Sequence, residues 1–490
     1  MKWFYIVLFL FQISVTKAQK QDRIWLFPDS GGIDFNNLSN PVSFRSNISY
    51  PTYWSTNISD NQGQLLFYVC GANLNLKPMR IYDRNGDLMQ GADTLEGYPW
   101  VCQGSMILPM PDDSMKYYVF IARRDGGLGN SMFYNLVDMN LNGGLGEVIS
   151  RDNLLISDHV NEKLNATKHA NGRDWWIILM STNTNQLFHK FLITPQGIQG
   201  PFDQLIGSSD NRNSFHGQMI FSKDGSKLGL VGSNSSVDIY DFDRCTGDLF
   251  NYKQVGEGIT TLQNYYFGCS FSPNGNIFYT SSIWYEYKNI YQYDLTAFDI
   301  RSTKQLIYAY QDTGVYQGLS IGAHLLGPDG KIYIAKGDAF IGGNSDTYYT
   351  HHMDVITDPN NPGIACNYTS CYLDLGSGRA VQGLPTMVNY NLGPVSGSVC
   401  DSLSIGIDEQ SNNNSLIQIF PNPFNKSITI QSTQPIDGLM KVYNELGSIV
   451  FSNHIIGNHN LDLTFLPSGN YILEIIGTTN VFRKKISKKD

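Results

Sequence analysis

Short apolar stretches alternate with polar residues along most of this chain, and tight turns separate them. The clearest turns are Ser-Lys-Asp-Gly at 222–225, Ser-Pro-Asn-Gly at 272–275 and Gly-Pro-Asp-Gly at 327–330. Asn-Gly and Asp-Gly pairs supply the positive φ angles that a β-hairpin requires. Counting weaker copies, successive turn markers lie 50 to 59 residues apart, at Gly63, Asp113, Gly172, Gly225, Gly275 and Gly330. The pattern therefore predicts hairpins that repeat about every fifty residues.

A second strand is expected after each marker, and another turn follows most markers after roughly 25 to 30 residues. Four strands in about fifty residues are typical of a β-propeller blade. Residues 383–390 look like the first strand of a further blade, whereas Ile24–Phe27 looks like a lone strand. We expect these two segments to pair and close the ring, which gives six or seven blades. The expected second strands are Leu65–Val69, Lys116–Ala122, Trp175–Met180, Lys227–Val231, Ile277–Thr280 and Lys331–Ala335.

The final residues follow a different rhythm. From 411 to 490, segments of four to seven residues alternate apolar and polar positions between Gly, Asn or Pro, as in a small antiparallel sandwich. Residues 393–410 are rich in Gly, Ser and Asn, which predicts a flexible linker. The expected fold is all-β, with a propeller at 19–392 and an Ig-like β-sandwich at 411–490.

Three motifs occur in a fixed order within this tail: Phe-Pro-Asn-Pro at 420–423, Val-Tyr-Asn-Glu-Leu-Gly at 442–447 and Leu-Pro-Ser-Gly-Asn-Tyr at 466–471, before a basic C-terminus. The tail resembles the type A sorting domain of the type IX secretion system, a family of Bacteroidota. The resemblance implies that the secretion machinery is a partner and that the destination is the outer-membrane surface or the extracellular space. The residues expected to form the sorting signal are Pro421, Asn422, Pro423, Gly469, Tyr471, Lys488 and Lys489.

The body also resembles a known group. Residues 24–35, 58–68 and 365–385 look like the WD40-like propellers that precede type IX sorting domains. This resemblance implies a propeller but no particular reaction.

The N-terminus indicates export independently of the tail. Lys2 precedes the apolar stretch 3–15, and Thr-Lys-Ala at 16–18 ends in a small residue. This pattern predicts a signal peptide over residues 1–18, cleaved between Ala18 and Gln19. The apolar stretch is shorter than the roughly 20 residues needed to span a bilayer, and no other stretch is long enough. We therefore expect an exported protein with no transmembrane segment.

Charge is distributed unevenly around a net value of −9. The tail from Ser411 carries seven Lys and Arg against five Asp and Glu, and the signal segment adds Lys2 and Lys17. Residues 19–410 therefore carry −13. Because binding to nucleic acid requires clustered positive charge, this acidic body argues against a nucleic-acid partner.

Seven cysteines are present, and an exported protein can form disulfides, but an odd number leaves at least one thiol unpaired. Proximity along the chain favours Cys366 with Cys371, Cys70 with Cys102, and Cys245 with Cys269. Neither Cys-x-x-Cys nor a matched spacing of Cys and His occurs, so we expect no metal and no cofactor.

Two groups of residues are candidates for chemistry or binding. Residues 318–322 fit the Gly-x-Ser-x-Gly nucleophile elbow, with His324 nearby, but a strand is predicted to follow where the elbow needs a helix. We therefore assign no catalytic residue. Aromatic side chains beside turns can stack on sugars or anchor a partner, although blades also bury aromatics between their sheets. The candidate ligand-binding residues are Tyr98, Trp100, Trp284 and Tyr285.

Two functions remain open. The propeller is either a secreted or surface module that binds a glycan or a protein, or a hydrolase or lyase that acts on polysaccharide or peptide at the channel mouth. No acid, base and nucleophile stand together at repeat positions, which favours the binding module.

Overall fold

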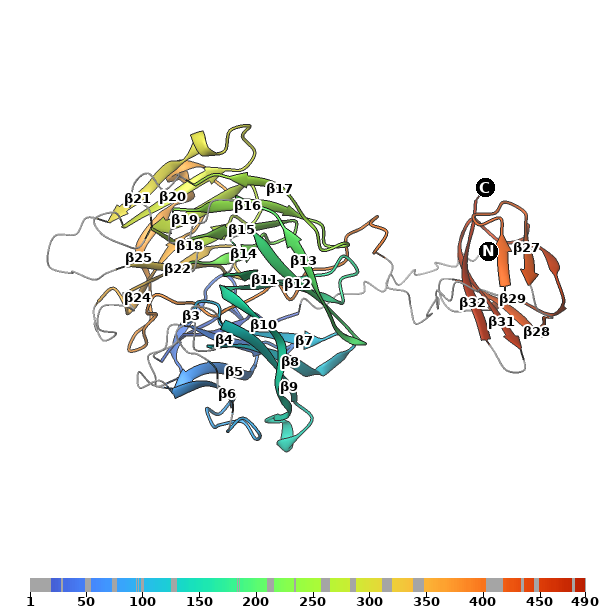
Figure 1. Ribbon diagram of the computed structural model, residues 1–490, viewed down its shortest axis with the longest axis horizontal. Coiled ribbons are helices and arrows are strands. Elements are labelled where there is room, and N and C mark those ends of the chain that lie inside the picture. Colours follow the sequence, from blue (N-terminus) through green and yellow to red (C-terminus); the bar gives the residue numbers. More distant parts are fainter. Residues whose placement is uncertain are drawn as a thin grey trace, which may run out of the picture. The chain divides into compact units, whose positions relative to one another are not determined.

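The computed structural model in Figure 1 comprises two compact units, residues 1–401 and 402–490. The structure describes residues 19–27, 30–48, 54–72, 77–93, 95, 97, 101–124, 130–182, 184, 186–208, 216–232, 235–256, 265–282, 288–310, 320–337, 348–401, 417–432, 436–444, 449–477 and 481–489. The expected signal peptide and its cleavage site at Ala18 lie at or beyond the edge of these ranges, and the cleavage stays a prediction.

The first unit is a β-propeller, and its described strands form seven blades. Each blade is an antiparallel sheet whose strands follow one another in sequence order, because short hairpin turns connect them. The first three blades comprise β1 (Ile24–Leu26), β2 (Gly31–Asp34) and β3 (Val42–Arg45); β4 (Ser55–Ser59), β5 (Leu65–Ala72) and β6 (Lys77–Asp83); and β7 (Ser105–Met110), β8 (Asp113–Arg124) and β9 (Asn130–Asp138) with the first part of β10 (Glu147–Lys168).

The long strand β10 joins the third and fourth blades into one continuous sheet. It pairs with β9 from Glu147 and with β11 up to Lys168, and bulges shift the register along the way. The fourth blade continues with β11 (Trp175–Ser181), β12 (Leu187–Thr194) and β13 (Gly197–Leu205). The fifth, sixth and seventh comprise β14 (Met219–Phe221), β15 (Lys227–Val231), β16 (Val237–Phe242) and β17 (Leu249–Gln254); β18 (Tyr266–Phe271), β19 (Ile277–Ser282), β20 (Lys288–Asp294) and β21 (Gln305–Tyr310); and β22 (Ile321–Leu326), β23 (Ile332–Lys336), β24 (His352–Ile356) and β25 (Tyr368–Asp374).

Helical structure within the described ranges is confined to three short 3₁₀ turns, η1 (Asn142–Gly144), η2 (Arg301–Thr303) and η3 (Gly363–Cys366). No helix in this part of the chain has the length and apolar character needed to cross a membrane.

The predicted turn markers are confirmed as the hairpins between the first and second strands of six blades. Five marker glycines have positive φ, and in the third blade Asp112 rather than Asp113 takes this conformation. Each hairpin is followed by a strand that covers most of the predicted second strand. The side chains between blades are large and apolar, and the clusters of buried aromatic and aliphatic residues form the core.

Ring closure differs from the expectation. Within the described residues, Ile24–Leu26 pairs with Gly31–Asp34 rather than with a late strand, because the N-terminal residues build a blade of their own. The first and seventh blades then meet through side chains, with the rings of Trp25 and Tyr333 5.5 Å apart. A single parallel bridge joins Ser30 to Arg379.

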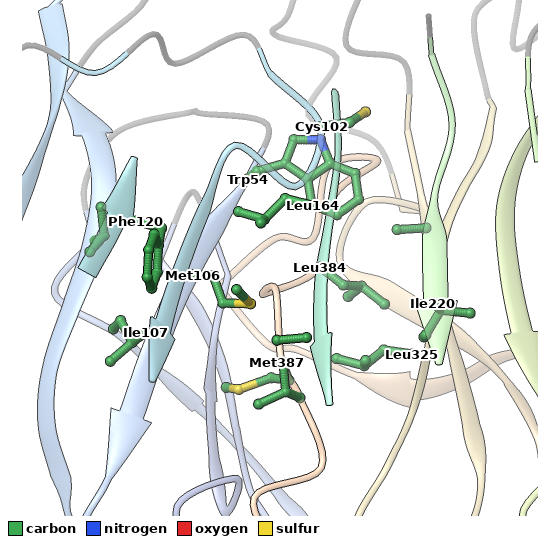
Figure 2. Packing of buried hydrophobic residues seen from close by; sticks show 14 of the residues in the cluster. Trp54, Cys102, Met106, Ile107, Phe120, Leu164, Ile220, Leu325, Leu384 and Met387 are labelled. Atoms are coloured by element: carbon green, nitrogen blue, oxygen red, sulfur yellow. The ribbon is translucent and has the colours of Figure 1, made fainter. Parts of the chain in front are cut away.

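Residues 383–390, predicted to begin a further blade, form no strand. They are almost entirely buried, and Figure 2 shows Leu384 and Met387 among side chains of several blades. The backbone of Thr386 bonds to Ser55 and to the hydroxyl of Thr56 in β4. The Tyr390 hydroxyl reaches the carbonyl of Ile107 in β7, 2.9 Å away. This segment therefore runs along the propeller axis, against the inner strands.

The propeller unit also includes the first residues of the expected linker. Arg244 donates a hydrogen bond to the Gly393 carbonyl at 2.6 Å, and Val395 donates to Ala170 at 2.8 Å. A disulfide joins Cys400 to Cys245, so residues 393–401 are fixed to the propeller although their composition is typical of a linker.

All three predicted cysteine pairs are wrong. Cys245 pairs with Cys400, 155 residues away, and the remaining cysteines are free thiols. Cys245 lies in the turn between β16 and β17, whereas Cys269 is buried in the inner strand β18. Proximity along the chain failed because the paired positions lie in different elements, such as Cys70 in β5 of the second blade and Cys102 before β7 of the third. The free thiols are Cys70, Cys102, Cys269, Cys366 and Cys371.

The second unit is a two-sheet sandwich. One sheet has the order β26-β27-β30 and the other β29-β28-β31-β32, and their inner faces share one apolar cluster. The strands are β26 (Ile417–Phe420), β27 (Ser427–Ser432), β28 (Asp437–Tyr443), β29 (Ile449–Ile456), β30 (His459–Asp462), β31 (Gly469–Gly477) and β32 (Val481–Lys488). The predicted all-β fold, a propeller followed by a sandwich, is confirmed.

Candidate functional site at one end of the propeller axis

Polar side chains gather where the inner strands of several blades begin. Two glutamines connect these strands. The Gln218 side chain accepts hydrogen bonds from the backbone of Cys269 and His324, at 3.0 and 2.8 Å, and so spans the fifth, sixth and seventh blades. The Gln103 side-chain amide donates a hydrogen bond to the Met219 carbonyl and accepts one from the Met219 N–H, each at 2.8 Å. These bonds satisfy buried polar groups and fix the positions of the residues beside them.

A carboxylate and an imidazole meet beside these glutamines. Glu162 Oε2 lies 3.1 Å from His216 Nδ1, and the Glu162 side chain is only 4% exposed whereas that of His216 is 33% exposed. An ionised carboxylate can only accept a hydrogen bond, so Nδ1 carries the proton and the ring is held in one orientation. A histidine oriented in this way can bind a polar ligand or accept a proton.

Lys163 contributes a buried amine to the same group. Its side chain is fully buried, and Nζ donates to the His216 carbonyl at 3.3 Å. Burial lowers the pKa of Lys163 to about 8, and nearby Glu162 offsets part of this shift. Perturbed titratable groups of this kind concentrate at functional sites.

Burial and the nearby Glu162 carboxylate raise the pKa of the Cys102 thiol. A thiol with a raised pKa stays protonated and is a poor nucleophile. Cys102 therefore completes the polar group without supplying nucleophilic chemistry. We refer to Cys102, Glu162, Lys163 and His216 as the mouth cluster.

Residues 381–390 close the axis beneath the mouth cluster. Figure 2 shows Leu384 and Met387 packed near Met106, Leu164 and Leu325. Beyond this plug, at the opposite end of the axis, a cavity of about 330 Å³ remains beside Met387 and Val388. Apolar side chains of the plug and the inner strands therefore fill the axis next to the mouth cluster.

His324 lies in the inner strand β22 and is fully buried. Neither ring nitrogen has a hydrogen-bond partner, and burial lowers the pKa of His324 to about 3. The proposed elbow serine, Ser320, is 3% exposed and precedes a strand rather than a helix. These positions therefore lack the exposed serine on a strand-to-helix turn that a nucleophile elbow requires.

The four aromatic residues predicted to bind ligand, Tyr98, Trp100, Trp284 and Tyr285, lie outside the described residues. Sequence reasoning missed Glu162, Lys163 and His216. A signal was present, because Gln103-Gly104, Gly217-Gln218 and Gln382-Gly383 repeat a Gln and Gly pair beside the axis. In the part of the chain that the structure describes, no three His, Cys, Asp or Glu side chains are placed to share a metal ion.

The predicted sorting residues gather at one corner of the second unit. The Asn422 side chain donates to the Lys485 carbonyl at 2.8 Å and accepts from the Ser487 backbone at 2.9 Å. It is flanked by Pro421 and Pro423, each preceded by a cis peptide bond. The proline motif is thereby fixed to the C-terminal strand β32.

The second proline motif meets the same strand. Lys488 Nζ donates to the carbonyls of Leu466 at 2.7 Å and Thr464 at 3.3 Å. The Tyr471 hydroxyl closes the turn that contains Gly469 by donating to Pro467 at 2.7 Å. Lys489 extends beyond this corner with an exposed side chain.

Solved structures with a similar fold cover the propeller at low identity. They include a putative 6-phosphogluconolactonase from Bacteroides uniformis, with 14% identity, a TM-score of 0.45, and coverage of 74% of this chain and 98% of that chain. A second, from Bacteroides fragilis, has 14% identity, a TM-score of 0.44, and coverage of 74% and 97%. The periplasmic gluconolactonase PpgL of Pseudomonas aeruginosa has 11% identity, a TM-score of 0.38, and coverage of 80% and 98%.

No curated protein matches this sequence. The second unit does match a known family: residues 418–489 fit the secretion system C-terminal sorting domain. The chain is therefore a β-propeller protein that the type IX secretion system exports, through this sorting domain, to the cell surface or the extracellular space.

Proposed function

We propose that the exported propeller is a binding module and that the mouth cluster holds its ligand. The observation that carries this proposal is the pairing of buried Glu162 with partly exposed His216 above an axis closed by residues 381–390. Burying a carboxylate and an amine is costly unless each has partners, so such groups are unusual in a purely structural position.

The ligand is expected to be polar and rich in hydroxyl or amide groups, as a glycan or a peptide is. The partly exposed His216 can bond such a ligand directly, and the buried Glu162 and Lys163 hold His216 in place. Trp100 lies two residues before Cys102 in the sequence, and Trp284 two residues after the end of β19. We include Tyr98, Trp100, Trp284 and Tyr285 in the proposal as aromatic contacts around the mouth.

The test uses the secreted protein on glycan and peptide arrays, followed by calorimetry on each hit. His216→Gln and Glu162→Gln are expected to weaken binding at least tenfold. A matched control is His454→Gln, because His454 forms an exposed pair with Asp437 in the sandwich, 3.1 Å apart. Undiminished affinity in both mouth variants would exclude this site. Unchanged affinity after Trp100→Ala with Trp284→Ala would remove the aromatic residues from the proposal.

Hydrolysis or elimination at the same mouth is the second candidate. It is favoured by the orientation of His216 by a buried carboxylate, which is how a general base is commonly positioned, and by the cationic Lys163 nearby. Product analysis of each bound polysaccharide or peptide separates the two functions. Turnover that His216→Gln abolishes would replace the binding proposal with this one.

A further inference from the structure

A second cleft lies at the other ends of the inner strands, away from the mouth cluster. It has a volume of about 600 Å³ and lies between the first hairpin turns of the second, third and fourth blades. Asp60, Asp112, Asp113 and Gln62 line its polar side, and Lys168 and Arg173 line the fourth-blade side. The cleft is independent of the proposed function, because none of its lining residues belongs to the mouth cluster.

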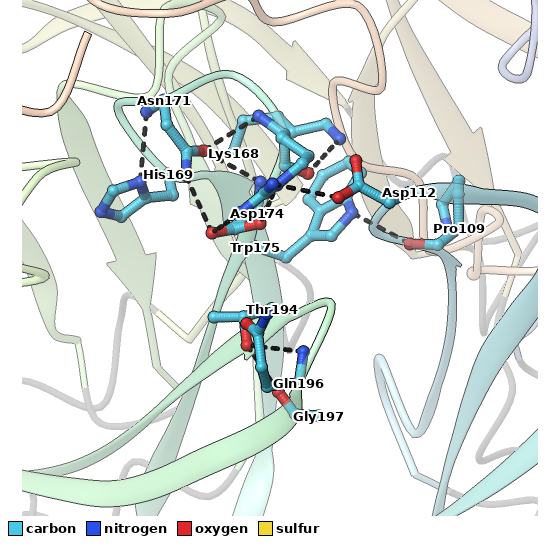
Figure 3. A network of polar contacts seen from close by, with 11 residues as sticks. Pro109, Asp112, Lys168, His169, Asn171, Asp174, Trp175, Thr194, Gln196 and Gly197 are labelled. Atoms are coloured by element: carbon cyan, nitrogen blue, oxygen red, sulfur yellow. Dashed lines mark hydrogen bonds and ion pairs between the residues drawn. The ribbon is translucent and has the colours of Figure 1, made fainter. Parts of the chain in front are cut away.

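Lys168 is the last residue of β10, and its amine is held in a defined place (Figure 3). Nζ lies 3.8 Å from the centre of the Trp175 ring and donates to the Arg173 carbonyl at 2.9 Å. Trp175 is in turn fixed by a hydrogen bond from Nε1 to the Pro109 carbonyl at 3.1 Å. The amine thus rests on a rigid aromatic face.

The nearest carboxylates are already engaged by other groups. Asp174 accepts hydrogen bonds from Arg173 at 2.7 Å and from Asn171 at 2.8 Å. Arg173 also bonds Asp112 at 3.0 Å. Among the described residues, Lys168 forms no ion pair with a carboxylate.

Burial disfavours the protonated form of Lys168. Burial lowers the pKa of Lys168 to about 7; Asp174 opposes this effect, and the cations of Arg244 and Arg173 add to it. A desolvated lysine beside another cation is the arrangement that makes an amine nucleophilic near neutral pH. Asp60, Asp112 and Asp113 face the cleft from the second and third blades.

We propose that Lys168 is a covalent binding site for a small hydroxylated aldehyde, such as a short aldose. The neutral amine attacks the carbonyl carbon to give a carbinolamine. Loss of water then forms the imine: a C=N bond replaces the C=O bond, the carbonyl oxygen leaves in the water, and the two amine hydrogens leave with it. No oxidant or reductant is required. The carboxylates and amides that line the cleft accept hydrogen bonds from the ligand hydroxyls.

The experiment traps the imine on the secreted, full-length protein. Glyceraldehyde and cyanoborohydride are added at pH 7, and the labelled lysines are quantified by peptide mass spectrometry. Lys116 and Lys227 are internal controls, because each forms an ion pair with an aspartate, at 3.0 and 2.8 Å. Lys168 is expected to react at least tenfold faster than either, since near neutral pH roughly half of its amine is unprotonated whereas an ordinary lysine has well under 1%.

The pH dependence of the labelling rate provides a second test on the same protein. Labelling of Lys168 should be half-maximal near pH 7, whereas the controls should still gain rate above pH 9. Equal rates at all three lysines would show adventitious reaction only and would overturn the proposal. An unreactive Lys168 would identify a purely structural cation and would overturn it as well.

Discussion

Cys245 and Cys400 form a disulfide that fixes the segment following the axial plug to the turn between β16 and β17. Residues 381–390 pass along the axis, Gly393 and Val395 bond to the fourth and fifth blades, and the disulfide follows. The disulfide thus lies in the sequence between the plug and β26, the first strand of the sandwich.

Replacing both cysteines, as Cys245→Ser with Cys400→Ser, is expected to lower the free energy of unfolding by about 2 to 5 kcal/mol. The bond closes a loop of 155 residues and so restricts the unfolded chain strongly. Chemical denaturation measures the loss, and limited proteolysis should show new cleavage within 393–401. Cys371→Ser, which removes a free thiol, is the control. Equal stability of the double variant and this control would show that the disulfide does not hold the segment.

Leu384 lies in the axial plug with 1% of its surface exposed, beside Met387. Leu384→Ala should cost about 2 to 5 kcal/mol, because it removes buried methyl groups and leaves a cavity that the rigid inner strands cannot fill. The matched control is Val399→Ala, whose side chain is 93% exposed in the same C-terminal region. Thermal denaturation of the two variants measures the difference. A cost below about 1 kcal/mol for Leu384→Ala would mean that the plug packs loosely.

His324 should make the propeller sensitive to acid. Its pKa is about 3 in the folded state, well below the value of 6.5 for an unperturbed histidine, so the unfolded chain binds the extra proton between these values. Stability from this residue is therefore complete above pH 6.5 and falls as pH decreases, by about 2 to 3 kcal/mol at pH 4.5.

His324→Leu removes the titrating ring together with its two unpaired nitrogens. Denaturant unfolding at pH 7 and pH 4.5 should show a smaller acid-induced loss in this variant than in the wild type. A parallel loss in both proteins would show that other groups dominate the acid response.

Lys488 and Lys489 should behave differently although they are adjacent and identical. Lys488→Met removes two hydrogen bonds to backbone carbonyls of the turn at 464–466, so the sandwich should lose about 1 to 3 kcal/mol. Lys489→Met changes an exposed side chain and should leave stability within about 0.5 kcal/mol. Thermal unfolding of the sandwich within the full chain measures both.

The cellular location of the protein tests the role of Asn422 in export. Asn422→Ala breaks the two bonds that fix the first proline motif to β32, and the protein is expected to accumulate in the periplasm. Asn453→Ala, at an exposed position of β29, is the matched control. Cell fractionation with immunoblotting measures the distribution. Normal surface display of Asn422→Ala would separate this corner of the sandwich from sorting.

The local pattern of the sequence determined much of the fold. Turns such as Asp224-Gly225 and Asn274-Gly275 specify hairpins through backbone conformation alone, so their positions and the strands after them could be predicted. The motif order of the tail likewise identified the sorting domain, because the proline and glycine positions of 420–423 and 466–471 are local features.

Only the tertiary structure decided how distant parts meet. Residues 383–390 read as a strand because buried apolar segments look alike in sequence, whether they pair in a sheet or fill an axis. Cys245 forms a disulfide with Cys400 because the chain returns along the axis. Glu162 contacts His216 because the ring places the starts of neighbouring inner strands side by side. Such contacts depend on how the blades pack around the axis, and no local pattern encodes that arrangement.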